Sequence, residues 1–304
     1  MDLHEAERLI EASTDHRLLR RVPPVERWRL DGSESVSASN VRRAIFLDTE
    51  TTGLDRDTDE VIELALLPFE YERDTGRIVH VDAQLAMSAF RQPSIPIPEE
   101  SSRIHGLTNE DVAGHVIDPE QIRSVLDSAQ LIIAHNASFD RPMVEKHWPI
   151  FESKHWACSL VDVDWKSEGL ATAKLDYLLM RQGWFHGEHR ALADALAAVF
   201  LLTLPLPLSG KPALAALLER ARRSLYAVRA EETAFEQRAA LKGRGYRWDS
   251  GDGRRPKAWW TSTDDWQREV AWLVAEIYGA PREIPVVKVP PTMRYSLRLW
   301  PEST

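Results

Sequence analysis

The order of apolar and polar positions predicts a strand-rich core that continues into alternating strands and helices. Short apolar runs typical of buried strands occupy 44–47, 61–69, 78–87 and 131–134. Apolar positions at helical spacing occupy 120–129, 139–147 and 191–202. Asp74-Thr75-Gly76 is a turn signal between the second and third strands, so the chain opens as an antiparallel meander. A meander followed by βα units indicates an α/β fold, with a mixed sheet flanked by helices.

Changes in composition divide the 304 residues into four predicted parts. Residues 1–41 are a helical lead-in with a Ser-rich linker, residues 42–204 form the main domain, and the proline-rich 205–212 is a linker. Residues 213–304 form a small α+β accessory domain, where a helix end, a strand, a tight loop and a second strand are expected between Leu241 and Trp260. Six of the 11 tryptophans lie in this last part.

The charge is unevenly distributed along the chain. There are 38 Lys and Arg against 47 Asp and Glu, a net charge of −9, which excludes a protein that grips nucleic acid by bulk charge. Residues 211–304, however, hold 17 basic and 12 acidic residues, whereas residues 1–210 hold 21 and 35. The two parts therefore have opposite net charge.

Cysteine usage and hydropathy favour a soluble protein of the cytoplasm. The single cysteine, Cys158, cannot form an internal disulfide, so a reducing compartment is expected. The first residues lack the apolar segment of a signal peptide. The most hydrophobic stretch, 195–208, contains two prolines and is too short to cross a bilayer, which needs about 20 helical residues. No membrane partner is expected.

Four acidic residues stand where strands end or helices begin. Asp48 and Glu50 are two apart at the end of the first buried strand, so both point to one face. Adjacent carboxylates repel unless a proton or a divalent cation lies between them, and oxygen ligands suit Mg²⁺ or Mn²⁺. Asp140 is expected in the first turn of a helix, and Asp194 lies on a helix that is otherwise apolar. Ordinary surface acids and a helix N-terminal acid are the alternative interpretations.

Three segments in this order resemble the exonuclease motifs of the DEDDh 3′–5′ exonucleases, a family of the RNase H-like superfamily that includes bacterial proofreading subunits. They are Asp-Thr-Glu-Thr-Thr-Gly at 48–53, His-Asn-Ala-Ser-Phe-Asp at 135–140 and His-Arg-Ala-Leu-Ala-Asp at 189–194. Ile-His-Gly-Leu-Thr at 104–108 is similar to a further segment of the family. The resemblance covers about 42–204 and implies an RNase H-like mixed five-stranded sheet flanked by helices.

The resemblance also implies a mechanism, in which nucleic acid is hydrolysed to nucleoside 5′-monophosphates with two divalent ions, Mg²⁺ or Mn²⁺. Asp48 would bridge both ions, Glu50 and Asp194 would complete one coordination sphere, and Asp140 would support the other. His189 would be the general base, since imidazoles titrate near neutrality. His186 is the competing candidate, with an exposed loop position as its alternative role.

The family's direction of attack implies contacts to the strand's 3′ end. Thr51 and Thr52 could hold the terminal 3′-hydroxyl, Leu54 could wedge against the last base, and His105 and Asn136 could contact the terminal nucleotide. Turn formation, packing and a structural role are the respective alternatives. The remaining acids of the first motif, at 55–63, are expected to be a solvated loop and a strand-face acid.

The basic C-terminal part combines cationic and aromatic residues, which suits single-stranded nucleic acid. The expected accessory contacts are Arg244, Arg247, Arg254, Arg255 and Lys257. A small-domain core of tryptophans with a solvated basic face is the alternative. The favoured function is a metal-dependent 3′–5′ exonuclease on single-stranded nucleic acid, with DNA preferred. An exoribonuclease that trims RNA 3′ ends and a non-catalytic nucleic-acid-binding accessory are the other hypotheses.

Overall fold

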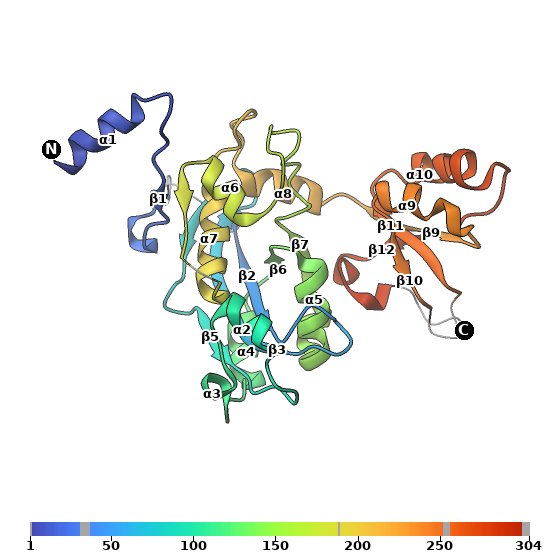
Figure 1. Cartoon of the computed structure of the whole chain (residues 1–304), viewed down its shortest axis with the longest axis horizontal. Coiled ribbons are helices and arrows are strands. Elements are labelled where there is room, and N and C mark those ends of the chain that lie inside the picture. Colours follow the sequence, from blue (N-terminus) through green and yellow to red (C-terminus); the bar gives the residue numbers. More distant parts are fainter. Residues whose placement is uncertain (1, 31–36, 188, 252–255, 300–304) are drawn as a thin grey trace. The chain divides into compact units, whose positions relative to one another are not determined.

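The chain folds into two compact units that divide after Ala221, as seen in a computed structural model (Figure 1). The structure describes residues 2–30, 37–187, 189–251 and 256–299. Arg254 and Arg255 lie outside the described residues.

The first unit is built on a mixed sheet. Its strands are β2 (Val41–Thr51), β3 (Val61–Glu72), β4 (Ile78–Val81), β5 (Met87–Phe90), β6 (Leu131–Ala134) and β7 (His155–Cys158). The order is β4-β3-β2-β6-β7, and β5 pairs with β3 beside β4. β2 is antiparallel to β3 and parallel to β6, so it lies in the middle of the sheet and its apolar residues 44–47 are fully buried.

The single strand expected at 78–87 is two strands in the structure, which makes the sheet six-stranded rather than five-stranded. The chain turns after β4, where the Asp82 carboxylate accepts a hydrogen bond from the Leu85 N–H (3.2 Å). β4 then pairs with the C-terminal half of the long β3, and β5 pairs with its N-terminal half. The polar turn thus divides the stretch that the sequence pattern predicts as one continuous strand.

The helices of the first unit are α1 (Leu3–Glu11), α2 (Glu99–His105), α3 (Asn109–Val112), α4 (Pro119–Leu126), α5 (Ala137–His147), α6 (Leu175–Arg181), α7 (Ala191–Thr203) and α8 (Ala213–Ala221). Two short strands, β1 (Arg20–Arg21) and β8 (Trp184–Phe185), pair with each other outside the main sheet. Short 3₁₀ turns are η1 (Val25–Arg27), η2 (Ala38–Asn40) and η3 (Pro149–Ser153). The predicted α/β class with helices flanking a mixed sheet is confirmed.

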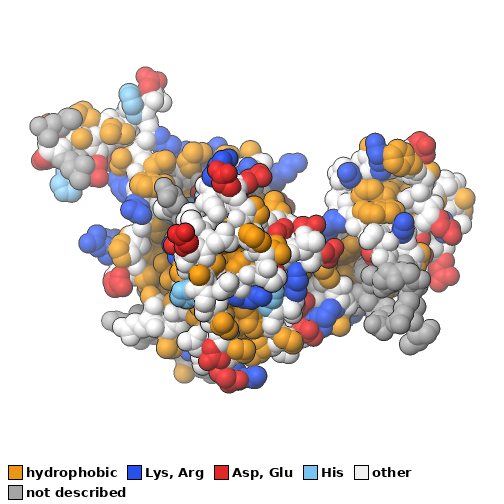
Figure 2. Space-filling model, turned by 60° about the horizontal axis from the view of Figure 1, so that its bottom comes forward, with side chains coloured by type: hydrophobic (Ala, Val, Ile, Leu, Met, Phe, Trp, Pro, Cys, Tyr) orange, Lys and Arg blue, Asp and Glu red, His pale blue; other side chains and the backbone are white. Residues whose placement is uncertain are grey.

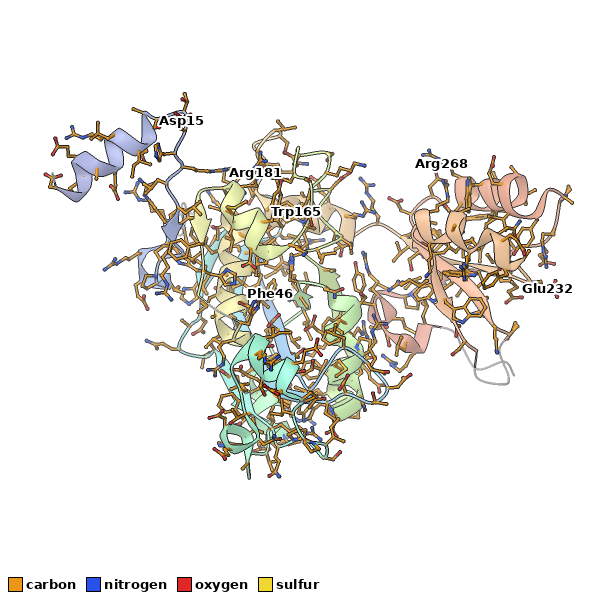
Figure 3. The ribbon with its side chains drawn as sticks, viewed as in Figure 1. Asp15, Phe46, Trp165, Arg181, Glu232 and Arg268 are labelled. Atoms are coloured by element: carbon orange, nitrogen blue, oxygen red, sulfur yellow. The ribbon has the colours of Figure 1, made fainter. Side chains whose placement is uncertain are left out.

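Helices α7 and α5 cover opposite faces of the sheet. Phe46, labelled in Figure 3, and its neighbour Ile133 belong to the apolar cluster that contains α7 and α8. Trp156 of β7 points to the other face, where the guanidinium of Arg141 on α5 lies 5.3 Å from its ring centre. Even-numbered positions of β2 therefore face α7, and odd-numbered positions face α5.

Helix α8 belongs to the first unit, nine residues beyond the boundary expected at residue 212. Its residues Leu214 and Leu217 are fully buried in the core of this unit. The β3–β4 turn touches it so closely that a Cβ on Gly76, which has φ +67°, would lie 2.5 Å from the Ala215 Cα. The prolines at 205–212 therefore lie in a turn between α7 and α8, within the first unit, and do not mark the end of a domain.

The second unit is a four-stranded antiparallel sheet with helices. Its elements are β9 (Leu225–Glu231), η4 (Phe235–Gln237), α9 (Arg238–Gly243), β10 (Arg247–Asp249), β11 (Ala258–Thr263), α10 (Trp266–Trp272), η5 (Leu273–Tyr278), β12 (Val286–Val289), η6 (Pro291–Met293) and η7 (Leu297–Leu299). The strand order is β10-β11-β9-β12. Trp259 packs in its core with Val228 and Leu241. In the described part of the chain, every helix is too short or too polar for a bilayer crossing.

Candidate active site

Three carboxylates meet at the end of β2. Asp48 and Glu50 are at even positions of this strand and so face α7, which carries Asp194 in its first turn. One carboxylate oxygen from each residue can be chosen so that all three lie within 4.8 Å of one another. The central strand and the helix packed on it therefore bring together acids that are almost 150 residues apart in the sequence.

Asp140 approaches from the opposite side of the sheet. It lies in the first turn of α5, is buried, and accepts a hydrogen bond from the Thr49 hydroxyl (2.9 Å). Thr49 is at an odd position of β2, between Asp48 and Glu50, so this bond fixes α5 to the same strand end. All four acids named from the sequence are thus arranged around the end of β2.

The acids strongly perturb one another. Burial raises the pKa of Asp48 well above its usual value, and the charges of Asp140, Asp194 and Glu50 raise it further. Burial, followed by the charge of Asp194, raises the pKa of Glu50 to about 8. Burial also raises the pKa of Asp140, against the lowering effect of the Thr49 hydroxyl. Without a cation the cluster holds protons at neutral pH, which is the state that a divalent ion replaces.

A guanidinium beside this cluster pairs with a different carboxylate, although its charge also lowers the pKa of Glu50. Arg190 donates to both oxygens of Glu63 (3.0 and 3.2 Å). Glu63 is 1% exposed, lies directly opposite Glu50 in the β2–β3 ladder, and also accepts from the Ser88 hydroxyl (2.9 Å). Carboxylate oxygens that converge within coordination range fit Mg²⁺ or Mn²⁺.

The Glu63–Arg190 pair was not singled out by the sequence. Glu63 was expected to be an ordinary strand-face acid, but it is buried and ties β3 to the residue that precedes α7. The two residues are 127 positions apart, so no local pattern reveals the contact. The available signal was an acidic residue within the otherwise apolar stretch 61–69.

Two histidines lie beside Asp194. His186 is nearly buried, with its Nε2 2.9 Å from Asp194 Oδ1 and its Nδ1 3.3 Å from Asp176 of α6. The hydrogen bond to Asp194 raises the pKa of His186 above its usual value. His189 is half exposed, and its Nδ1 is 4.0 Å from Asp194 Oδ2. The exposed-loop alternative for His186 is wrong, since its side chain is packed between two carboxylates.

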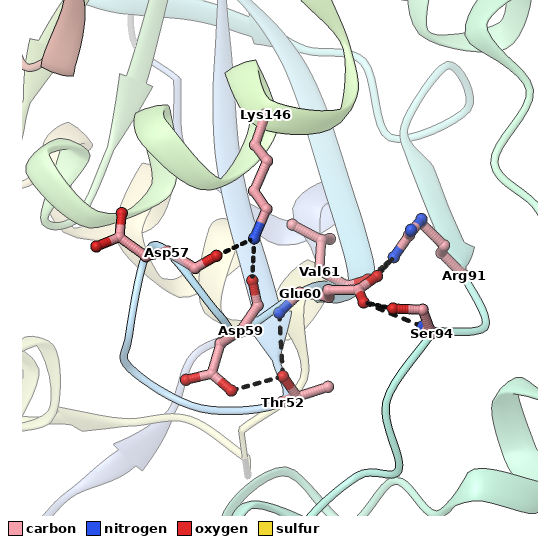
Figure 4. Close-up of polar contacts among 8 residues, drawn as sticks. All are labelled: Thr52, Asp57, Asp59, Glu60, Val61, Arg91, Ser94 and Lys146. Atoms are coloured by element: carbon pink, nitrogen blue, oxygen red, sulfur yellow. Dashed lines mark hydrogen bonds and ion pairs between the residues drawn. The ribbon is translucent and has the colours of Figure 1, made fainter.

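The loop that follows β2 is held by many hydrogen bonds (Figure 4). Thr52 is fully buried, and its hydroxyl donates to Asp59 (2.8 Å) and accepts from the Glu60 N–H (3.0 Å). Lys146 of α5 donates to the backbone carbonyls of Asp57 and Asp59 (2.9 and 3.0 Å). A side chain at Gly53 would collide with the Asp59 carboxylate. The loop is solvent-exposed, as expected, and these hydrogen bonds fix its conformation.

The other predicted substrate contacts have different environments. Leu54 is 85% exposed on the fixed loop, whereas the buried Thr51 donates its hydroxyl to the Gly53 carbonyl (2.6 Å). His105 is buried, and its Nδ1 accepts from the Leu107 N–H (3.1 Å). Among the described residues, no hydrogen-bond partner is found for the buried His105 Nε2. Asn136 is exposed and adopts a left-handed conformation at the start of α5 (φ 91°).

A mixed α/β sheet with carboxylates gathered at the end of its central strand defines a class of metal-dependent nucleases. The sequence profile of the exonuclease family matches residues 45–202, slightly more than half of the chain. The chain therefore belongs to the DEDDh 3′–5′ exonucleases of the RNase H-like superfamily.

Curated relatives agree with this assignment. DNA polymerase III subunit epsilon of Buchnera aphidicola subsp. Schizaphis graminum is 28% identical over 179 residues, which cover 54% of this chain and 72% of the relative. The same subunit of Rickettsia conorii is 31% identical over 163 residues, 52% of this chain and 62% of the relative. A PolC-type DNA polymerase III of Thermotoga maritima is 32% identical, but the match spans only 13% of its length.

Solved structures of exonucleases are also similar. Exonuclease X in complex with 5′ overhanging duplex DNA is 26% identical, with 53% of this chain and 89% of that chain covered and a TM-score of 0.39. Escherichia coli exonuclease I in complex with an oligonucleotide is 14% identical, with 73% and 63% covered and a TM-score of 0.49.

The carboxylate repulsion makes a prediction for the metal-free protein. Because the pKa of Glu50 is raised from 4.5 to about 8, the folded protein holds a proton that the unfolded chain loses between these values. The free energy of unfolding should therefore fall as pH rises through this window. In EDTA, Glu50→Gln should be more stable than wild type at pH 9 by on the order of 2 kcal/mol, and close to wild type at pH 4.

Urea unfolding at the two pH values measures this difference, with Glu100→Gln, an exposed acid of α2, as the control. Mg²⁺ should then stabilise wild type more than Glu50→Gln. A Glu50→Gln protein that is equally destabilised at both pH values would show that the carboxylate is part of the packing rather than a source of repulsion.

Proposed function

We propose that this chain is a 3′–5′ exonuclease that hydrolyses single-stranded nucleic acid, with DNA preferred, to nucleoside 5′-monophosphates. The observation that carries the proposal is the meeting of Asp48, Glu50 and Asp194 within 4.8 Å, with Asp140 behind them. The names of the curated relatives, which are subunits of DNA polymerases, support DNA as the polymer. The cytoplasmic location expected from the sequence stays a prediction.

In this proposal the four acids are metal ligands. Asp48 would contact two ions, Glu50 and Asp194 would complete one coordination sphere, and Asp140 would support the other. Two divalent cations supply charge for the attacking water and for the leaving 3′-oxygen of a phosphodiester. The protein's own contribution is position, because β2, α5 and α7 hold the ligands before substrate arrives.

His189 is the proposed general base. It is half exposed next to Asp194, in the loop between β8 and α7, where it would accept the proton of the attacking water. His186 is hydrogen-bonded to Asp194, and its proposed role is to orient this carboxylate as a metal ligand. The two histidines thus have separable roles.

Contacts to the terminal nucleotide are proposed for residues around the β2 end. The buried His105 Nε2, for which the described residues provide no hydrogen-bond partner, suits a polar group of the terminal sugar. Leu54 is an exposed apolar side chain on a fixed loop and suits the face of the last base. Thr51, Thr52 and Asn136 are assigned to this region too, although the Thr52 hydroxyl already has two partners within the loop.

The second unit is a proposed accessory site for a single strand. Trp248 is 52% exposed and packs edge-on against Trp259, and Lys257 is exposed immediately before β11. The Arg247 guanidinium lies 4.4 Å from the centre of the Trp260 ring. Aromatic faces combined with cations suit the bases and phosphates of an unpaired strand.

Arg244 has a different environment from the other predicted accessory residues. It donates to both oxygens of Glu269 (2.9 and 3.0 Å) and lies 4.3 Å from the centre of the Trp272 ring. The Tyr246 hydroxyl donates to the same carboxylate (2.9 Å). The charge of Arg244 is thereby compensated within the unit, so we expect a smaller contribution to phosphate binding than from Lys257.

The first experiment is digestion of single-stranded DNA and RNA of one sequence, labelled at the 3′ or the 5′ end, with Mg²⁺, Mn²⁺ or EDTA. Wild type should produce a metal-dependent ladder that shortens from the 3′ end, and Asp194→Ala should produce none. Faster digestion of RNA would favour the exoribonuclease hypothesis. Binding without cleavage of either polymer would overturn the proposal in favour of a non-catalytic accessory.

The two histidines should respond differently to substitution. His189→Ala should lower kcat by about 10²- to 10⁴-fold at every Mg²⁺ concentration, because a general base is lost. His186→Ala should weaken Mg²⁺ binding by about 10- to 100-fold, with activity recovered at high Mg²⁺, because a ligand loses its orientation. A Mg²⁺ titration of kcat separates the two. The reverse pattern would make His186 the base.

The accessory site predicts a change in salt dependence. Lys257→Ala should weaken binding of a single-stranded oligonucleotide several-fold and reduce the slope of log Kd against log salt by about 0.7, the value for one lost phosphate contact. Arg244→Ala is the matched control: it should destabilise the second unit by leaving the Glu269 carboxylate with the Tyr246 hydroxyl but without its cationic partner, with little change in slope. An unchanged slope for Lys257→Ala would support a purely structural unit.

A further inference from the structure

The N-terminal lead-in lies outside the residues that match the exonuclease family, yet it is part of the first unit. Its strand β1 pairs in parallel with β8. The Arg20 N–H donates to the Gly183 carbonyl (2.9 Å), and the Val22 N–H donates to the Phe185 carbonyl (2.8 Å). The Arg17 guanidinium donates to the Arg181 carbonyl at the end of α6. Backbone pairing therefore sets the position of the lead-in against β8.

An aromatic cluster anchors the same segment. Trp28 is 9% exposed, and its ring centre is 5.2 Å from that of Phe200 on α7. Trp184 of β8 packs on the same Phe200 at 4.9 Å. The Trp28 indole donates to the Pro23 carbonyl (2.7 Å), so the ring is also satisfied as a polar group. Lead-in, β8 and α7 thus share one packed contact.

β8 leads directly into the loop that carries both active-site histidines. His186 follows β8, and His189 and Arg190 precede α7. His186 Nε2 is 2.9 Å from Asp194 Oδ1, and His189 Nδ1 is 4.0 Å from Asp194 Oδ2. A segment that is paired with β8 therefore lies close to the loop that carries these histidines. The lead-in is in this way a neighbour of the candidate active site.

Arg21 places a guanidinium against this loop. A Cβ on Gly187, between the two histidines, would lie 2.6 Å from the Arg21 Nη2. Its neighbour Arg20 points the other way and pairs with Glu11 (2.7 Å). Arg21 is exposed, and among the described residues no carboxylate forms an ion pair with it. Successive residues of one short strand thus have different roles, one in an ion pair and one beside the histidine loop.

A cation at this position would reduce the repulsion between the acidic first unit and a nucleic-acid strand. Residues 1–210 carry 21 basic and 35 acidic residues, and the cluster at β2 adds a local concentration of carboxylates. A polyanionic strand approaching such a surface is repelled unless a positive group meets its phosphates. Guanidinium groups bind phosphate oxygens through two parallel N–H donors, which makes arginine well suited to this task.

We propose that Arg21 is a substrate-binding residue that contacts a phosphodiester group of the bound strand. The lead-in supplies this arginine to the exonuclease domain. This inference rests on the proposed function of the first unit. It adds a binding group from a segment that the family match does not include. The glycine at 187 leaves room for the guanidinium, which a side chain there would move aside.

The test compares Arg21→Ala and Arg21→Lys with Arg20→Ala in the full chain. Fluorescence anisotropy of a labelled single-stranded oligonucleotide in EDTA gives Kd at several salt concentrations, and digestion with Mg²⁺ gives kcat and KM. Arg21→Ala should raise Kd and KM about five- to tenfold, leave kcat within about twofold, and reduce the salt slope by about 0.7. Arg21→Lys should retain most of the slope, and Arg20→Ala should match wild type.

Two results would overturn the inference while leaving the proposed function intact. One is an Arg21→Ala protein with the Kd, KM and salt slope of wild type. The other is a fall in kcat with unchanged KM and slope, which would mean that Arg21 only supports the histidine loop. Failure of the proposed function is seen separately, as wild-type protein that cleaves neither polymer.

Discussion

Repulsion among carboxylates at one end of β2 is the constraint on which the rest of the first unit depends. Asp48, Glu50 and Asp194 converge on one point, and burial makes the charges of Asp48 and Glu50 more costly. Such an arrangement persists only where the scaffold is rigid. β2 is paired on both sides, its residues 44–47 are fully buried, and α5 and α7 press on its two faces. The free energy of packing holds the charges in place.

Two basic residues near the carboxylates at the end of β2 stabilise the surrounding elements by pairing with other groups, and not with the carboxylates themselves. Arg190 is bound to Glu63, which ties the start of α7 to β3. Lys146 donates to two backbone carbonyls of the loop after β2. If either cation instead paired with Asp48 or Glu50, those carboxylates would be worse metal ligands. Glu63 and the loop carbonyls thus keep Arg190 and Lys146 from pairing directly with the metal ligands.

Sequence was sufficient for the elements whose signal is local, and insufficient for contacts between distant residues. The apolar run 131–134 is β6, and the alternation that places Asp48 and Glu50 on one face follows directly from strand geometry. The break between β4 and β5 depends on one polar turn inside an apolar stretch. The assignment of α8 to the first unit, the burial of His186 and the Glu63–Arg190 pair all depend on partners far away in the sequence.

The electrostatics also impose an order on binding. Without metal the cluster holds protons at neutral pH and offers no positive charge to a phosphate, whereas two divalent cations would replace those protons and attract the phosphates that the protein is proposed to hydrolyse. Substrate then binds productively only to the metal-loaded site, and cations outside the cluster determine where the strand lies before that. Arg21 belongs to this second group, because it stands beside the histidine loop and not among the ligands. Phosphate recognition at a distance from the carboxylates allows an acidic catalytic unit to bind a polyanion without weakening its own metal ligands.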